Sequence, residues 1–276
     1  MNRRFRAELR GVYIIWYRDV IRFWRNRPRI FSSLAQPVLF LLVFGNGLAT
    51  AFGGAAHGAF AGAGSYILFL FPGVVAMAIL FTGIFSAMST VWDREFGFLR
   101  EVLVAPVSRN AVAVGKALGG STQAVFQGCI VLLLAPFAGV TLTPLLILEM
   151  LPLMFLLAFA MTSLGIVVAS RLKTMEGFGV VVNFLVMPLF FLSGALFPLE
   201  GIPQWLAVLT RLDPATYGVA PLRRVVLSAV GSPAAVTATQ ITIFGYPLGT
   251  PAEVVILTAF ALVMVTLAAH FFGTIE

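Results

Sequence analysis

Six charged side chains gather between Trp92 and Arg109, although only 11% of the 276 residues are charged. They alternate with apolar residues, so this segment is able to form a short amphipathic helix; the six are Asp93, Arg94, Glu95, Arg100, Glu101 and Arg109. Long apolar runs lie on both sides of it. Because a bilayer core has no water to solvate charges, the segment must lie outside that core. The pattern predicts a helix that lies between two membrane spans and that a soluble partner is able to bind.

The usual patterns of catalytic and nucleotide-binding sites are absent from the sequence. Neither lysine, Lys116 or Lys173, stands in a Gly-Lys-Ser/Thr phosphate loop, and no H-E-x-x-H or G-x-S-x-G pattern occurs. A single cysteine, Cys129, excludes an intramolecular disulfide and a cysteine metal cluster. We therefore expect a chain that is not an enzyme and that binds no metal or cofactor itself.

The composition is that of a membrane protein. Hydrophobic residues make up 60% of the chain, whereas soluble domains have roughly 45–50%. The mean hydropathy is +1.00. The net charge of +7 does not indicate nucleic acid, because basic residues beside membrane spans set topology and contact anionic lipid. We expect a polytopic protein with membrane lipid around it and no nucleic-acid partner.

The fold class predicted is all-α, with one transmembrane domain over residues 1–276. Residues 1–29 read as an amphipathic helix lying in the membrane interface and ended by Pro28, because apolar side chains recur at steps of three and four between Phe5 and Phe23. Six spans are expected after it, and they cover residues 30–50, 66–91, 111–137, 144–170, 178–197 and 252–272. Residues 92–109 form the charged segment.

Basic residues predict the orientation of these spans. Fifteen of the 18 Lys and Arg residues lie at the amino terminus, in or just after the charged segment, or in the link between the fourth and fifth spans. By the positive-inside rule both termini and the charged segment are cytoplasmic. Residues 198–251 are then external, and their spacing predicts two short helices at 203–210 and 215–230.

Several polar side chains inside the spans are candidates for a substrate pathway. They are Gln123, Gln127, Asn183 and Ser193, with Phe197 beside them and Glu149 as the main intramembrane carboxylate. The alternative for each is a hydrogen bond between helices or, for Glu149, a position at the outer interface. The Gly115-x-x-x-Gly119 spacing predicts that another helix approaches closely there.

Two stretches resemble the type-2 ABC exporter permeases, in particular the daunorubicin-resistance-like and nodulation-factor-export branches. The first runs from Arg94-Glu95-x-Gly97 through Arg100-Glu101 to Pro106-Val-Ser-Arg109. The second runs from Pro188 to Pro198 and continues as Pro203-Gln-Trp-Leu206 and Asp213-Pro-Ala-Thr-Tyr217, where Asp213 replaces a common Asn. The resemblance spans nearly the whole chain, and the two motifs occur in the order that the family has.

This resemblance implies a permease that dimerises, with a homodimer expected. It also implies that the permease binds two copies of a separate cytoplasmic ABC ATPase, which carries ATP and Mg. It implies a coupling element made of Arg94, Glu95, Gly97, Arg100, Glu101 and Pro106, against which the ATPase docks. It also implies residence in the bacterial inner (plasma) membrane as a multi-pass protein. The amino-terminal helix is expected to lean on the ATPase.

The leading function is therefore a subunit of an ATP-driven exporter of an amphipathic molecule, such as a drug in multidrug resistance, a lipid or a natural product. Export of a polysaccharide or lipid-linked glycan is the main alternative. An ion-coupled secondary transporter is disfavoured, because the sequence shows no evident charge pairs within the spans.

Overall fold

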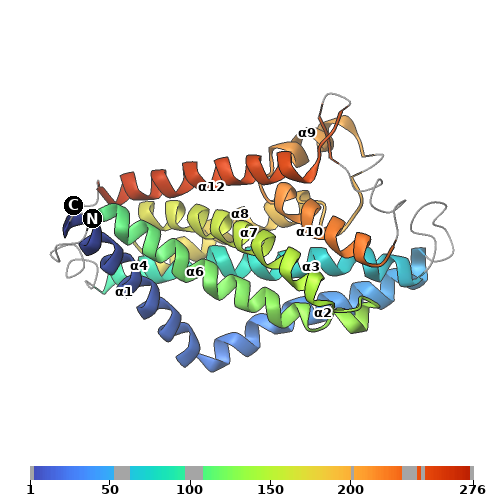
Figure 1. Ribbon diagram of the computed structural model, residues 1–276, viewed down its shortest axis with the longest axis horizontal. Helices are drawn as coiled ribbons and strands as arrows, with labels where there is room; N and C mark the ends of the chain where they lie inside the picture. The colour runs from blue at the N-terminus through green and yellow to red at the C-terminus, as the bar shows by residue number, and fades with distance from the viewer. Residues whose placement is uncertain are drawn as a thin grey trace.

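The chain folds as an elongated helical bundle in the computed structural model, which describes residues 3–52, 63–96, 108–199, 202–231, 241–243 and 246–273. The start of α1 and the end of α12 lie at the same end of the bundle (Figure 1). The helices α9 and α10 lie toward the opposite end. The bundle therefore has two distinct ends: one holds the start of α1 and the end of α12, and the other lies toward α9 and α10.

The first two helices meet at a sharp bend (Figure 1). Helix α1 covers Arg3–Arg25 and α2 covers Arg27–Phe52, with Asn26 between them. Pro28 is the second residue of α2, where its missing N–H is not needed for the helix. The sequence interpretation that Pro28 ends the first helix was wrong, because the break lies at Asn26 and Pro28 starts the next helix.

The centre of the bundle is built from three helices. Helix α3 covers Ala63–Ser86 and continues after Ala87 as the short α4, Met88–Glu95. Helices α6, Arg109–Leu132, and α7, Pro144–Arg171, pack against α3 and against each other, with the short 3-10 helix η1, Ala135–Ala138, between them. Every residue from Phe69 to Leu80 of α3 is buried, so α3 is the central helix.

The remaining helices enclose this centre. Helix α8 covers Met175–Leu192, α9 covers Gln204–Leu212, α10 covers Thr216–Ala229 and α12 covers Thr250–Gly273. Helix α8 is shorter than the predicted span to Phe197, because the chain turns at Ser193 and Gly194 takes a positive φ of 71°. A small antiparallel pair, β1 Thr242–Ile243 and β2 Tyr246–Pro247, precedes α12 and was not predicted.

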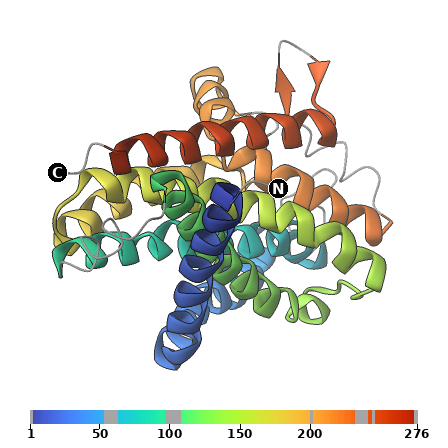
Figure 2. The same cartoon turned by 60° about the vertical axis from the view of Figure 1, so that its left-hand side comes forward.

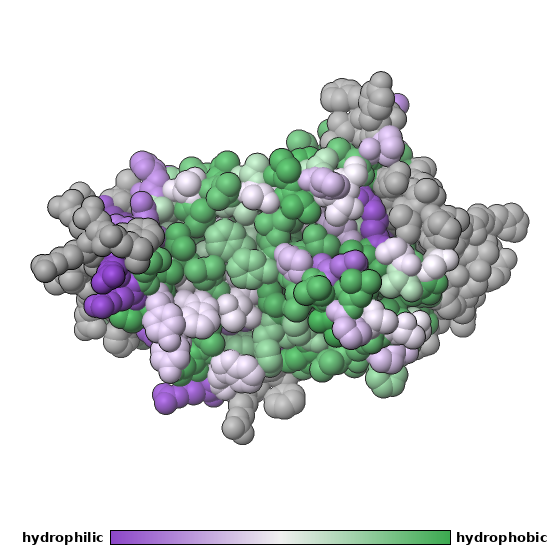
Figure 3. Space-filling model, viewed as in Figure 1, coloured by the Kyte–Doolittle hydropathy of each residue, from purple (hydrophilic) through white to green (hydrophobic). Residues whose placement is uncertain are grey.

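The surface matches a protein that lies in a membrane. Among the described residues, four helical stretches are long and apolar enough to cross a bilayer: Tyr66–Glu95, Pro144–Arg171, Met175–Leu192 and Thr250–Phe272. In α8 and α12 only 22% of the apolar window is buried, so most of these side chains face outward. Figure 3 shows the resulting hydrophobic belt across the middle of the molecule, with hydrophilic residues gathered toward the ends.

The α1 helix crosses the outside of the bundle (Figure 2). Its packing partner is α6. A Cβ on Gly115 would lie 2.9 Å from the Cβ of Ile15, and one on Gly119 would lie 3.0 Å from the Cβ of Asp19. Both glycines therefore allow α1 to approach α6, as the spacing of the pair predicted, and the partner helix is α1.

Candidate functional site

A buried aspartate at the end of α4 organises the charges at one end of the bundle. Asp93 is only 2% exposed. Its carboxylate accepts hydrogen bonds from Lys116 Nζ at 2.8 Å, Arg18 Nη2 at 2.7 Å and Arg22 Nη1 at 3.5 Å. A buried carboxylate needs such partners, because its desolvation costs several kcal/mol. The contacts tie α1, α4 and α6 together at one point.

A second carboxylate joins this group from α1. Asp19 is 4% exposed, and its carboxylate lies 3.5 Å from Arg18 and 4.0 Å from Lys116. The Gln123 side chain donates a hydrogen bond to the backbone oxygen of Asp19 at 3.2 Å. We call the five side chains Asp19, Asp93, Arg18, Arg22 and Lys116 the charge cluster. It holds two carboxylates and three cations.

The next two residues of α4 brace it against the connection between α7 and α8. Arg94 Nη1 donates to the backbone oxygens of Ser170 at 3.0 Å and Leu172 at 3.1 Å, which belong to the end of α7. Glu95 Oε2 accepts the backbone N–H of Met175, the first residue of α8, at 3.2 Å. A cation on the last carbonyls and a carboxylate on the first amides suit the two helix ends. Any push on α4 is therefore transmitted to α7 and α8.

Four of the six predicted coupling residues lie outside the described residues. These are Gly97, Arg100, Glu101 and Pro106. Of the helix predicted within residues 92–109, residues 92–95 form the end of α4 and residues 97–107 lie outside the described residues. Arg94 and Glu95 are described, and both contact the α7–α8 connection. The coupling role of all six residues stays a prediction.

The structure separates the predicted pathway residues. Gln123 and Gln127 are buried on α6, and the Gln127 amide has no hydrogen-bond partner among the described residues. Glu149 and Asn183 are exposed on α7 and α8. Two further residues follow at the end of α8: the Ser193 hydroxyl donates to the Phe190 backbone oxygen at 2.7 Å, and Phe197 is half-buried. These residues do not gather at one place, and a pathway role stays a prediction for each.

The opposite end of the bundle contains two buried arginines that sequence reasoning did not single out. Arg223 of α10 is 3% exposed and donates to the backbone oxygens of Gly194 at 2.8 Å, Ala195 at 3.1 Å and Phe69 at 3.3 Å. Its guanidinium also lies 3.8 Å from the centre of the Phe69 ring. It therefore fixes the chain after α8 to the start of α3.

The neighbouring Arg224 pairs with Glu253, which is fully buried in the first turn of α12. Sequence reasoning did not find this pair, because its two members lie 29 residues apart and on different helices. Both Asp93–Lys116 and Arg224–Glu253 join residues that are distant in sequence. The available signal was a basic residue inside an apolar helical pattern, at Lys116 and at Arg224.

Asp213, between α9 and α10 and outside the four candidate spans, is 4% exposed. One carboxylate oxygen accepts the Ala215 backbone N–H at 2.8 Å. Burial raises the pKa of Asp213 from its ordinary 3.8 to about 8. The folded protein therefore keeps a proton that the unfolded chain releases at neutral pH.

The Asp213→Asn variant is expected to remove a pH-dependent loss of stability. Because the folded pKa is the higher one, the stability contributed by Asp213 is fully present below pH 3.8 and is lost as the pH rises to about 8. Asn keeps the acceptor for Ala215 and carries no charge. In detergent, parent and variant should have equal melting temperatures near pH 4. Near pH 8 the variant should melt higher, by about 2–4 °C for each kcal/mol of stability that it regains. Parallel melting curves of parent and variant across this range would contradict the assignment.

The fold defines the chain as a multi-pass helical membrane protein, and comparison with known proteins gives its family. The ABC-2 type transporter model matches residues 10–227. This chain belongs to the ABC-2 type transporter family. The chain is therefore a non-enzymatic membrane subunit, and its activity is transport across a membrane.

Curated relatives agree with this family. The chain is 31% identical over 218 residues to ycf38 of Cyanophora paradoxa, which is named as a transport permease, covering 78% of this chain and 73% of the relative. It is 26% identical over 223 residues to the inner membrane transport permease YadH of Escherichia coli K12, covering 76% and 80%. It is also 26% identical over 217 residues to nodulation protein J of Rhizobium leguminosarum bv. trifolii, covering 77% and 80%.

Proposed function

We propose that this chain is the membrane-spanning subunit of an ATP-driven ABC exporter that moves an amphipathic small molecule, drug or lipid out of the cytoplasm or inner leaflet. The observation that carries the proposal is the bracing of α4 by Arg94 and Glu95 on the α7–α8 connection. ATP and Mg are bound by two copies of a separate cytoplasmic ATPase, which docks on the charged segment. Two copies of this chain form the transport path.

The proposed topology has six spans in the bacterial inner membrane. Helices α2 and α6 cross the bilayer together with the four candidate spans. Their lengths of 26 and 24 residues suffice for about 30 Å of hydrocarbon. The end of the bundle that holds the charge cluster, the start of α1 and the end of α12 is cytoplasmic, and α9 and α10 are external. The excess of basic residues at the first end supports this orientation.

The physical basis of coupling is a rigid lever. Helix α4 extends the central helix α3, and its last residues hold the ends of α7 and α8. Movement of an ATPase against the charged segment therefore moves three helices together. Such rigid-body motion is one of the ordinary ways in which a local event changes the state of a whole protein.

The test is to purify the tagged permease from its native membrane and identify its partners by mass spectrometry. A stoichiometric chain with a Gly-Lys-Ser/Thr phosphate loop is expected. The Glu95→Ala, Glu101→Ala double variant should insert normally but bind that ATPase at least about a hundredfold more weakly, because charge-assisted hydrogen bonds contribute about 1.5–3 kcal/mol each. Gln204→Ala, exposed at the opposite end, is the control. Recovery of the permease without any ATPase, or normal ATPase binding by the double variant, would refute the coupling role.

A further inference from the structure

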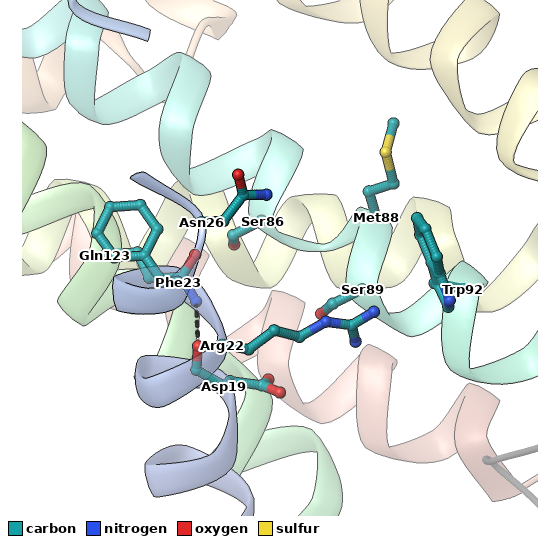
Figure 4. Close-up of a pocket in the computed structure, with 9 residues that line it drawn as sticks. All are labelled: Asp19, Arg22, Phe23, Asn26, Ser86, Met88, Ser89, Trp92 and Gln123. Carbon is teal, nitrogen blue, oxygen red and sulfur yellow. Dashed lines mark hydrogen bonds between the residues drawn. The ribbon is translucent and has the colours of Figure 1, made fainter. Parts of the chain in front are cut away.

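Two neighbouring cavities open beside the charge cluster, and they share Phe23 and Met88 as lining residues. The first has a volume of about 240 Å³ and lies between α1, the α3–α4 junction and α6 (Figure 4). The second has a volume of about 400 Å³ and lies between α2 and α3. This second volume alone is within the range of roughly 300–1,000 Å³ that small-molecule sites occupy.

The first cavity is polar. Its wall includes Asp19 and Arg22 of α1, Ser86 and Ser89 near the α3–α4 junction, Trp92 of α4 and Gln123 of α6. Figure 4 shows that the α1 residues face those of α3 and α4 across the space, with the Arg22 side chain extended toward Ser89 and Trp92. The ion-pairing groups in it come from the charge cluster. We call it the headgroup cavity.

The electrostatics of the headgroup cavity favour one negative charge. The charge cluster has three cations and two carboxylates, so one positive charge remains unbalanced. Arg22 is its most exposed member, with 45% of its side chain accessible, and its guanidinium carbon lies 5.2 Å above the Trp92 ring. A guanidinium in this position is able to bind a phosphate oxygen without leaving the cavity wall.

One acceptor in the headgroup cavity still lacks a donor. Oδ1 of Asp19 is buried and accepts no hydrogen bond from the part of the chain that the structure describes, although Arg18 lies 3.5 Å away. A buried acceptor without a partner costs about as much as a lost hydrogen bond. A ligand hydroxyl would fill that need, whereas an added ammonium group would bring a second positive charge. The headgroup that fits is a singly charged phosphodiester with hydroxyl groups.

The second cavity is mainly apolar. Met77, Ala78, Phe81 and Phe85 of α3 form one side, and Pro37 of α2 lies on another. Ser32, Gln36 and Thr82 add three polar side chains. The Phe81 ring also packs edge-on against Phe190 of α8 at 6.0 Å. This surface suits a hydrocarbon chain, and we call it the chain cavity.

We propose that the headgroup and chain cavities together bind one amphiphile of the phosphatidylglycerol type, a monoanionic phosphodiester with hydroxyl groups and acyl chains. The inference rests on the proposed function and names the substrate class of that exporter. The headgroup binds Arg22 and Asp19, and an acyl chain lies along α3 past Phe23 and Met88. The site takes the amphiphile from the leaflet in which α1 lies.

Trp92 in the headgroup cavity makes the site measurable. The chain has only four tryptophans, so replacing Trp16, Trp24 and Trp205 by Phe leaves Trp92 as the sole reporter. The purified permease in phosphatidylcholine nanodiscs is mixed with phosphatidylglycerol that carries brominated acyl chains, which quench nearby tryptophan. Brominated phosphatidylcholine and brominated phosphatidylethanolamine are the comparison probes. Half-maximal quenching by phosphatidylglycerol is expected at about tenfold lower mole fraction than by either zwitterionic lipid.

Two variants separate the two cavities. Arg22→Gln is expected to remove the preference for phosphatidylglycerol, and Ala78→Phe is expected to fill the chain cavity and abolish quenching by every brominated lipid. Arg25→Gln, exposed on the same helix and outside both cavities, is the matched control and should behave like the parent. Melting temperatures measured in parallel identify a variant that has simply unfolded. If Ala78→Phe unfolds, Ala78→Leu, which has a smaller side chain, takes its place.

Two results would overturn the site. Equal quenching by phosphatidylglycerol and the zwitterionic lipids would show that the site does not recognise an anionic headgroup. Quenching that survives Ala78→Phe but disappears in Arg25→Gln indicates lipid held only on the basic surface of α1. No ATPase is present in this experiment, so its outcome is separate from the partner test. If an ATPase co-purifies but the quenching shows no lipid selectivity, only the lipid site is refuted. If the quenching is lipid-selective but no ATPase co-purifies, only the exporter function is refuted.

Discussion

The Asp93→Asn variant is expected to lose about 3 kcal/mol or more of stability, because it leaves the Lys116 ammonium buried without its closest carboxylate. Only 3% of the Lys116 side chain is accessible, and Asp93 is its partner at 2.8 Å. The remaining carboxylate, Asp19, is 4.0 Å away. Arg18 also loses a partner, but 39% of its side chain is accessible and can be hydrated. The penalty therefore falls mainly on Lys116.

The measurement uses the single cysteine. Cys129 is half-buried in α6, and its reaction with a thiol-sensitive dye during heating in detergent reports unfolding. The double variant Asp93→Asn, Lys116→Met should recover much of the loss, because it removes the buried charge as well as its partner. Glu8→Ala, which removes an exposed carboxylate from α1, is the control. A double variant less stable than both single variants would contradict a paired role for these charges.

The second large effect is expected at Arg223. Arg223→Met removes the donors to three backbone oxygens, those of Gly194, Ala195 and Phe69. Each buried oxygen left without a donor costs about 1–3 kcal/mol, so the total loss is about 3 kcal/mol or more, and part of it is offset by the desolvation that Arg223 no longer bears. The same dye assay on Cys129 measures the change.

Two further variants make the Arg223 result specific. Arg223→Lys keeps the charge, but a single ammonium group cannot donate to the three acceptors as the forked guanidinium does. The stability of this variant should therefore lie between those of the parent and Arg223→Met. Arg211→Met, in the partly exposed last turn of α9, should melt like the parent. If Arg223→Met is as stable as Arg211→Met, the contacts to α3 and to the end of α8 do not hold the two helices together.

Arg223 and Glu95 together show how α3 and α8 are joined at both ends. Glu95 binds the first residue of α8, and Arg223 binds the chain just after its last turn and the start of α3. Close packing adds to this, since a Cβ on Gly73 of α3 would lie 2.3 Å from the backbone oxygen of Ala195. We expect α3 and α8 to move as one unit when the charged segment is pushed.

Helix positions were largely predictable from the sequence. The predicted span at 144–170 corresponds to α7, Pro144–Arg171, and the predicted short helices at 203–210 and 215–230 correspond to α9 and α10. Apolar runs and local caps decide these bounds: the Thr143 hydroxyl, for example, accepts the Leu146 backbone N–H at the start of α7. The end of α8 was harder to place, because apolar residues continue beyond the turn at Gly194.

The site was predictable only in part. The motif around Arg94 and Glu95 gave the correct family, and the spacing of Gly115 and Gly119 gave a close helix contact. Gln123 was singled out for a pathway, but its described contact is with the Asp19 backbone. Asp93 was read as one more charge of a solvated segment, whereas it is buried among cations from α1 and α6.

The sequence by itself determined that this protein lies in a membrane, approximately where most of its helices begin and end, and to which family it belongs. These properties depend on local composition, because a helix satisfies its own backbone hydrogen bonds and its apolar length has to match the bilayer. Only the tertiary structure decided that Asp93 meets Lys116, that Arg223 binds the end of α8, and that two cavities share Phe23 and Met88. Such pairings join residues from different helices, and the packing of those helices, rather than any spacing along the chain, brings them together.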